Sequence, residues 1–145
     1  MLNSRLINAY CDLHPTVRPL CVFIKFWARQ RELNDPGGAK GPVTFSSYTL
    51  ILLVIAYLQQ CEVLPNLQDP FLIASTATAR QLFWSRPRQG RKGKKVTVQP
   101  SMGWDVTFLE KIPAGLNWTV AAGLELADLA KGFFRYYTTD FDPAR

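Results

Sequence analysis

Four side chains of this sequence are of types, and at spacings, that could grip a phosphate-bearing ligand. Lys25 and Arg29 are four positions apart in a segment with helical periodicity, so both project from one helix face. Ser47 and Tyr48 stand in the first turn of a further predicted helix, which begins at Ser46. The first amides of a helix have no intrahelical partner, and together with the helix dipole they attract phosphate.

The two pairs predict one clamp on two adjacent helices. Lys25 would act as a point charge and Arg29 as a fork on a triphosphate, while the ring of Tyr48 could lie against a base. Each pair also has a plainer interpretation. Two cations on a packed helix are usually a solvated stripe, and Tyr48 is equally consistent with an ordinary core aromatic.

A run of basic residues is the second candidate surface. Residues 86–95 contain six basic residues and no acidic one, and outside this run 11 basic residues balance 11 acidic ones. The whole excess charge of +6 therefore sits in one loop that would face a polyanion. Its basic residues are Arg86, Arg88, Arg91, Lys92, Lys94 and Lys95. A localisation signal or a solubility tail is the alternative interpretation.

Composition indicates an intracellular globular domain. The 145 residues are 48% hydrophobic, which is too many for disorder. The three cysteines form no Cys-x-x-Cys pair and the single histidine, His14, completes no zinc site, so reduced thiols are expected. The longest apolar run, residues 50–58, is about half of a membrane span, and the N-terminus lacks the layout of a secretory signal. We therefore predict a cytoplasmic or nuclear protein that contacts no membrane.

Apolar spacing predicts four helices. They cover residues 2 to about 11, 15 or 16 to about 31, 46 to about 60, and about 124 to 137. Pro15 suits a first helical turn, whereas His14 would be a poor N-cap. A serine hydroxyl should cap the third helix, which is apolar nearly all round and should be the central buried one.

The candidate core follows from the same periodicity. Leu6, Ile7 and Tyr10 are available to it from the first helix, and Trp27 and Leu52 should contribute stability. The inner side of the last helix is predicted to carry Leu126, Leu129, Phe133, Phe134 and Tyr137. Between residues 61 and 123 prolines interrupt the pattern, so only short pieces near 73–83 and 106–109 are expected to be regular.

Several of these segments resemble the central domain of terminal uridylyltransferases and cytoplasmic-type poly(A) polymerases. The similarity is carried by residues 3–10 (NSRLINAY), 17–20 (VRPL), 23–31 (FIKFWARQR), 33–36 (LNDP), 45–50 (FSSYTL) and 64–67 (LPNL). It resumes at residues 103–106 (GWDV), 132–137 (GFFRYY) and 141–143 (FDP). The resemblance spans the chain apart from the basic run.

The resemblance implies a role for each matching residue. Asn3 matches the family's ribose-binding asparagine, a role that rests on the resemblance alone. Lys25 and Arg29 match the pair that neutralises the triphosphate, the second of which is usually Lys. Ser47 matches a hydroxyl on the terminal phosphates and Tyr48 the aromatic that stacks on the base. His14 stands where the family usually has Asp, a change expected to affect a helix cap.

The resemblance also implies what lies outside these residues. In that family the catalytic carboxylates, which bind two divalent metals for phosphoryl transfer, belong to a separate domain upstream of the position of Asn3. The Asp140-Phe141-Asp142 pair falls in the family's Phe-Asp-Pro segment and is interpreted as a turn. Mg²⁺ or Mn²⁺ would be held by the other domain, so we expect this chain alone to bind no metal and to add no nucleotides.

These observations predict a mainly α fold, a helical bundle with at most a short β element, as one half of a two-domain nucleotidyltransferase. Residues 1–145 would form one nucleotide- and RNA-binding domain with a basic insertion at about 85–100. The implied function is template-independent addition of nucleotides from UTP or ATP to an RNA 3′ end, with the basic run contacting RNA. A non-catalytic RNA- or nucleotide-binding module and a helical protein-interaction domain are the alternatives.

Overall fold

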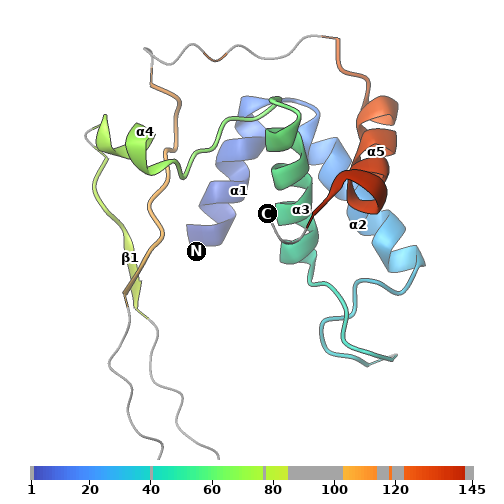
Figure 1. The fold of residues 1–145 in the computed structure, drawn as a ribbon. Coiled ribbons are helices and arrows are strands. Elements are labelled where there is room, and N and C mark those ends of the chain that lie inside the picture. Colours follow the sequence, from blue (N-terminus) through green and yellow to red (C-terminus); the bar gives the residue numbers. More distant parts are fainter. Residues whose placement is uncertain are drawn as a thin grey trace, which may run out of the picture.

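Four helices pack together into a bundle, and a smaller arm stands beside it (Figure 1). The bundle consists of α1 (Leu2–Leu13), α2 (Val17–Gln30), α3 (Ser47–Gln60) and α5 (Leu126–Arg135). The computed structural model describes residues 2–39, 41–76, 78–84, 103–113, 118 and 123–142. The predicted fold class, mainly α with a short β element, is confirmed.

The junction between α1 and α2 depends on His14. This histidine is 3% exposed, and its Nδ1 accepts a hydrogen bond from the backbone N–H of Thr16 at 3.2 Å. The Thr16 hydroxyl lies 2.7 Å from the same nitrogen. The ring nitrogen thus does what an aspartate oxygen would do two residues before a helix. The sequence predicted that His14 would be a poor N-cap, and the N-cap position of α2 is indeed occupied by Thr16. It did not predict the turn that the His14 ring makes with Thr16.

Helix α3 is the central element of the bundle. The hydroxyl of Ser46 accepts from the amide of Thr49 at 3.0 Å, which confirms the predicted serine cap. The helix packs against α2, and it contacts α5 through Tyr57 and Phe133 and α1 through Gln59 and Tyr10. The prediction that Leu52 belongs to the core is wrong, because this side chain is 37% exposed.

Helix α5 supplies an aromatic layer that packs on α2 and α3. Phe133 is buried, and its neighbour Phe134 stacks against Trp27 of α2 with ring centroids 4.6 Å apart. Leu126 is 38% exposed, so the inner side of this helix begins at Leu129 and not at Leu126 as predicted. The chain continues beyond the α-helix as a π-helical turn, Tyr136–Asp140, which the sequence pattern did not indicate.

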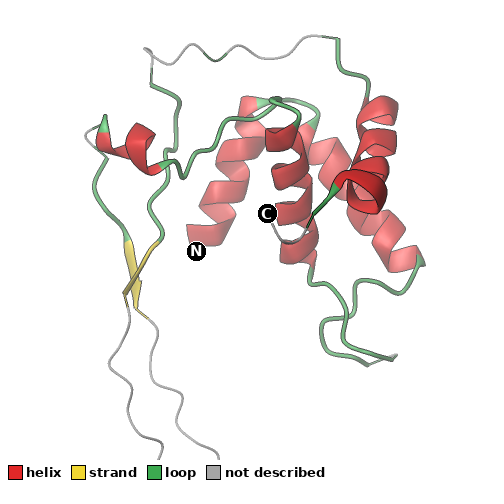
Figure 2. Cartoon of the chain, viewed as in Figure 1, coloured by secondary structure: helices red, strands yellow, loops and turns green. Residues whose placement is uncertain are grey.

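The hairpin arm comprises α4 (Pro70–Ala74), β1 (Leu82–Trp84), β2 (Gly103–Asp105) and the segments beside them, residues 68–84 and 103–113 (Figure 2). The two strands are antiparallel, with Leu82 opposite Asp105. The expected regular pieces near 73–83 and 106–109 were only partly right: a five-residue helix starts earlier, at an Asp69 cap, and residues 106–109 are not a strand.

The arm joins the bundle through a small number of buried groups. Phe108 and Leu109 are almost completely buried in the common core, and the amide of Leu109 donates to the carbonyl of Leu67 at 2.9 Å. The hydroxyl of Tyr10 accepts from the Leu67 amide at 3.2 Å and from Gln59 Nε2 at 2.9 Å. Burial raises the pKa of Tyr10, so the hydroxyl stays neutral in this junction.

Candidate nucleotide site

Two helix ends lie at the end of the bundle where the clamp is predicted. Helices α2 and α3 pack against one another and run in opposite directions (Figure 1). The last turns of α2 and the first turn of α3 therefore lie at the same end of the bundle, joined by residues 31–46. The N-terminal end of α1 points toward this end as well (Figure 1). This arrangement brings the elements that carry the candidate residues to one side of the molecule.

The loop between α2 and α3 is fixed by hydrogen bonds from Asn34. Its side-chain amide donates to the carbonyl of Phe45 at 3.0 Å, and its side-chain oxygen accepts from the hydroxyl of Ser47 at 3.2 Å. The Thr44 hydroxyl accepts from the Asp35 amide at 2.7 Å, and the Thr44 amide donates back to Asp35 at 3.0 Å. Sequence analysis included Asn34 only in the segment 33–36 that carries the resemblance, although its side chain has both a donor and an acceptor and can therefore hold two parts of a loop together.

The start of α3 is organised so that two serines have different tasks. Ser46 is the cap, and its hydroxyl is occupied by the amide and the hydroxyl of Thr49. Ser47 is half-buried, and its hydroxyl oxygen keeps acceptor capacity while it donates to Asn34. Tyr48 is half-buried, so part of this residue remains accessible to solvent. The first helical amides point out of the helix because they have no intrahelical acceptor.

Lys25 and Arg29 occupy the side of α2 that α5 does not cover. Trp27 faces α5 through Phe134. Cys21, one turn before Lys25, has a thiol whose pKa burial raises to about 12, with a further increase from the Cys11 thiol of α1 and a decrease from Lys25. Lys25 is half-buried, one turn after Cys21 on the same side of α2, and Arg29 is exposed one turn later. Both cations are thus accessible on the part of α2 that leads to the start of α3.

Asn3 lies in the first turn of α1 and is exposed. The structure therefore leaves its side chain accessible at the same end of the bundle, while the direct contacts among Asn3, Lys25, Arg29, Ser47 and Tyr48 stay a prediction. The six basic residues from Arg86 to Lys95 lie outside the described residues. Among the residues that the structure describes, no group of three His, Cys, Asp or Glu side chains is placed to hold a metal ion.

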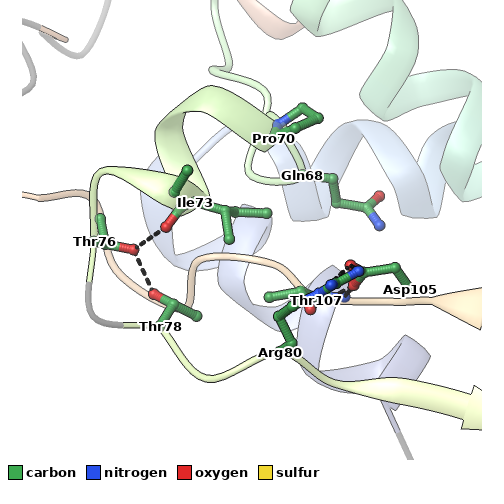
Figure 3. A pocket seen from close by; sticks show the side chains of 9 residues that line it. Gln68, Pro70, Ile73, Thr76, Thr78, Arg80, Asp105 and Thr107 are labelled. Atoms are coloured by element: carbon green, nitrogen blue, oxygen red, sulfur yellow. Dashed lines mark hydrogen bonds and ion pairs between the residues drawn. The ribbon is translucent and has the colours of Figure 1, made fainter.

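An open cavity lies away from the predicted clamp. It measures about 630 Å³ and is at the base of the hairpin arm between α4 and the strands (Figure 3). Its polar wall includes Arg80 and Asp105, neither of which sequence analysis singled out. The signal available for this site was weak, because isolated Arg and Asp residues 25 positions apart carry no recognisable spacing.

Comparison with known proteins identifies the family. No protein-family model matches the chain. The poly(A) RNA polymerase GLD2 of Rattus norvegicus is 34% identical over 97% of this chain, and the terminal uridylyltransferase cid1 of Schizosaccharomyces pombe is 29% identical over 97%. A crystal structure of the Cid1 poly(U) polymerase bound to MgATP superposes over 99% of this chain with a TM-score of 0.61 and 28% identity. The chain belongs to the terminal nucleotidyltransferase family.

The chain matches only part of the length of its relatives in the terminal nucleotidyltransferase family. The chain spans 24% of the length of GLD2, 28% of that of cid1 and 36% of the Cid1 chain in the crystal structure. The family assignment therefore concerns the helical segment described here, and the relatives contain much more chain than this segment. Within the described residues, no helix is both long enough and apolar enough to cross a membrane.

Proposed function

We propose that this chain is the nucleotide-binding helical domain of a template-independent RNA 3′-terminal nucleotidyltransferase that adds U or A. The observation that carries the proposal is the antiparallel packing of α2 on α3, because it brings the last turns of α2 and the first turn of α3 to the same end of the bundle. The family relationship supports the same reaction class.

The phosphates of the nucleotide would lie between the two helix ends. Lys25 supplies a single positive charge and Arg29 a planar fork of donors, and together they offset the charge of a triphosphate. The amides at the start of α3 and the helix dipole add donors and positive potential on the other side. Ser47, held by Asn34 at 3.2 Å, presents its hydroxyl at that helix start.

The base and the ribose would lie on opposite sides of these phosphates. The partial exposure of Tyr48 is compatible with a stacking role, because a base can lie on an aromatic ring without sequence preference. Asn3 at the start of α1 is accessible for ribose hydroxyls, a role carried over from the family. UTP and ATP are both compatible with these contacts, since none of the five residues reads the edge of the base.

The remaining parts of the reaction belong to the complete enzyme. A separate domain of the same protein would contribute the carboxylates and bind Mg²⁺ or Mn²⁺, which activates the RNA 3′ hydroxyl and stabilises the leaving pyrophosphate. The relative Cid1 was crystallised with MgATP. We expect the 145-residue chain by itself to extend no RNA primer with either metal, and extension that a substitution within the chain abolishes would contradict this.

The Lys25→Ala substitution in the complete enzyme tests the proposal. Loss of one charged contact should weaken UTP or ATP binding by about 1.5–3 kcal/mol, which is roughly 10- to 150-fold in Kd. The melting temperature should scarcely change, because Lys25 is only half-buried and a solvent-accessible cation contributes little to stability. Lys131→Ala is the matched control, since Lys131 is an exposed helical lysine of α5 paired with Asp128 at 3.3 Å. Equal nucleotide affinity of the two variants would refute the clamp.

We further propose that the basic run, Arg86 to Lys95, adds RNA affinity without sequence preference. Each phosphate contact on a single strand steepens the dependence of log affinity on log salt by roughly 0.7. Binding of an RNA oligonucleotide at rising salt should therefore show a shallower slope after residues 86–95 are deleted. Identical slopes would favour the alternative, a localisation signal.

A further inference from the structure

Two open cavities share a rim at the base of the hairpin arm, outside the proposed nucleotide site. The first measures about 630 Å³ and lies between α4 and the strand bases, and the second measures about 570 Å³. Thr76 and Thr78 line both of them. Each volume is within the range of small-molecule sites, so each cavity has room for one nucleotide.

The first cavity combines an apolar wall with a polar one (Figure 3). Pro70 and Ile73 of α4 form the apolar wall, and Arg80 with Asp105 forms part of the opposite side. Gln68 adds an amide that can donate and accept. A nucleotide requires this combination, because its base is flat and largely apolar on its faces whereas its edges, sugar and phosphate are polar.

Arg80 is held in one orientation and still has donors available. Its Nε and Nη2 both donate to one oxygen of Asp105, at 3.0 and 2.8 Å. The other oxygen of Asp105 accepts from the amide and hydroxyl of Thr107, which hold the pKa of the carboxyl down to about 2 together with Arg80. The Nη1 of Arg80 makes no hydrogen bond to any described residue. A planar guanidinium fixed in this way is suited to a phosphate oxygen.

The second cavity leads toward the bundle. It is lined by Arg5 of α1, which is ion-paired with Glu110, and by Lys111. Arg5 lies two positions from Asn3, the residue assigned to the ribose in the proposed nucleotide site. The two cavities share a rim, and each has the size of one nucleotide. They therefore suit a ligand of linked nucleotides better than a single free nucleotide. Together they extend from the arm to α1.

The surrounding charge favours the same type of ligand. Strand β1 begins two positions after Arg80, and the basic run begins six positions after Arg80, at Arg86. The excess positive charge of the chain therefore follows Arg80 closely in the sequence. A local positive potential of this kind concentrates polyanions.

We propose that these cavities bind consecutive nucleotides of the RNA substrate upstream of its 3′ end, with the 3′ end directed toward α1. The direction of the strand rests on the proposed nucleotide site, whereas the occupancy of the cavities does not. The ligand is single-stranded, because each cavity must admit an unstacked nucleotide whose base faces Ile73 or the apolar residues of the second cavity.

The test uses the complete enzyme and a single-stranded RNA of about 15 nucleotides, near the upper site size of single-strand-binding folds. Ala74→Phe fills the first cavity from an exposed position of α4. Arg80→Gln removes the oriented guanidinium. Each variant is expected to weaken RNA binding roughly tenfold, in line with the loss of a contact to a charged group. Binding of UTP and ATP should be the same as for the unmodified enzyme.

Lys131→Gln is the matched control, because Lys131 is an exposed cation in a surface ion pair, as Arg80 is. Equal losses for Arg80→Gln and Lys131→Gln would show that only net charge matters and would overturn the proposal. Unchanged RNA affinity of Ala74→Phe at an unchanged melting temperature would overturn it too, as would a loss of UTP or ATP affinity in that variant. A weakened RNA complex in Ala74→Phe, combined with normal nucleotide affinity in Lys25→Ala, would support the cavities and remove the proposed nucleotide site.

Discussion

The helical bundle and the hairpin arm are held together by different interactions. The bundle buries an apolar core to which α1, α2, α3 and α5 all contribute. In the arm, α4 has no buried residue and every residue of β2 is exposed. Polar contacts replace the core there: Thr107 bonds to both Gln81 and Asp105, and Asp105 bonds to Arg80. Stability should therefore reside in the bundle, while the arm should mainly shape a surface for a ligand.

Phe108 offers the strongest test of this difference, because it is the larger of the two adjacent arm residues, Phe108 and Leu109, that are buried in the common core. It is 1% exposed. Phe108→Ala should lower the free energy of unfolding by about 3–5 kcal/mol through lost burial and a cavity. Trp104→Ala, only four positions away but 54% exposed, should change it by less than about 0.5 kcal/mol. Urea unfolding of both variants provides the measurement, and similar losses would mean that the arm has a core of its own.

Gly132 tests the packing inside the bundle. A Cβ at this position would lie 2.2 Å from the hydroxyl oxygen of Tyr57, which is itself 5% exposed. Alanine normally stabilises a helix relative to glycine, but here the overpacking should dominate and Gly132→Ala should cost about 1–3 kcal/mol. In a Tyr57→Phe background the loss should be smaller, since the nearest remaining atom is Cζ at 3.2 Å. A double-mutant cycle by thermal unfolding would detect this, and additive effects would place the strain elsewhere.

The sequence predicted the bundle well because its signals are local. The apolar spacing located α2 and α3 to within one or two residues, and Ser46 marked the start of α3. The exposure of Leu52 and Leu126 was not predictable in the same way, because it depends on which neighbouring elements pack over each helix and not on the sequence of the helix itself. The close approach at Gly132 likewise requires knowledge of Tyr57 across the interface.

The arm and much of the candidate site were harder to predict for a physical reason. Helix α4 and the strands have five and three residues each, too short for a periodic pattern. The ion pair of Arg80 and Asp105 joins residues that only the hairpin brings together. In the candidate site, charge and hydroxyl positions indicated Lys25 and Ser47 from local sequence, whereas the tie from Asn34 to Ser47 became visible only with the folded loop.

The two adjacent serines at the start of α3 separate stability from binding within the bundle. Ser46→Ala removes the cap on the Thr49 amide and should cost about 1 kcal/mol. Ser47→Ala removes a single 3.2 Å contact to Asn34 and should cost less stability, but it should weaken nucleotide binding in the complete enzyme. Measurements on both variants should therefore show a larger loss of melting temperature for Ser46→Ala and a larger loss of nucleotide affinity for Ser47→Ala. A larger stability loss for Ser47→Ala would indicate that the loop tie outweighs the cap.

The smallest effect on overall stability is expected from acid titration of the arm. The Thr107 hydroxyl and amide, with Arg80, lower the pKa of Asp105 to about 2, below the usual value of about 3.9 for an unfolded chain. A carboxyl with a depressed pKa contributes stability above its unfolded pKa and loses that contribution as pH falls through its folded pKa. The contacts of Asp105 should therefore persist at pH 5 and weaken between about pH 4 and pH 2.

Because the side chains of Arg80 and Asp105 are 74% and 43% exposed, the melting temperature should hardly respond. The amide resonance of Thr107, which donates to Asp105 at 3.0 Å, should instead shift with a midpoint near pH 2. In Arg80→Gln the midpoint should move only modestly upward, since Thr107 supplies the largest part of the lowering and Arg80 a smaller part. A midpoint near 4 in the unmodified protein would mean that Asp105 is not held by Thr107 in solution, and the oriented guanidinium at the base of the arm would then lose its support.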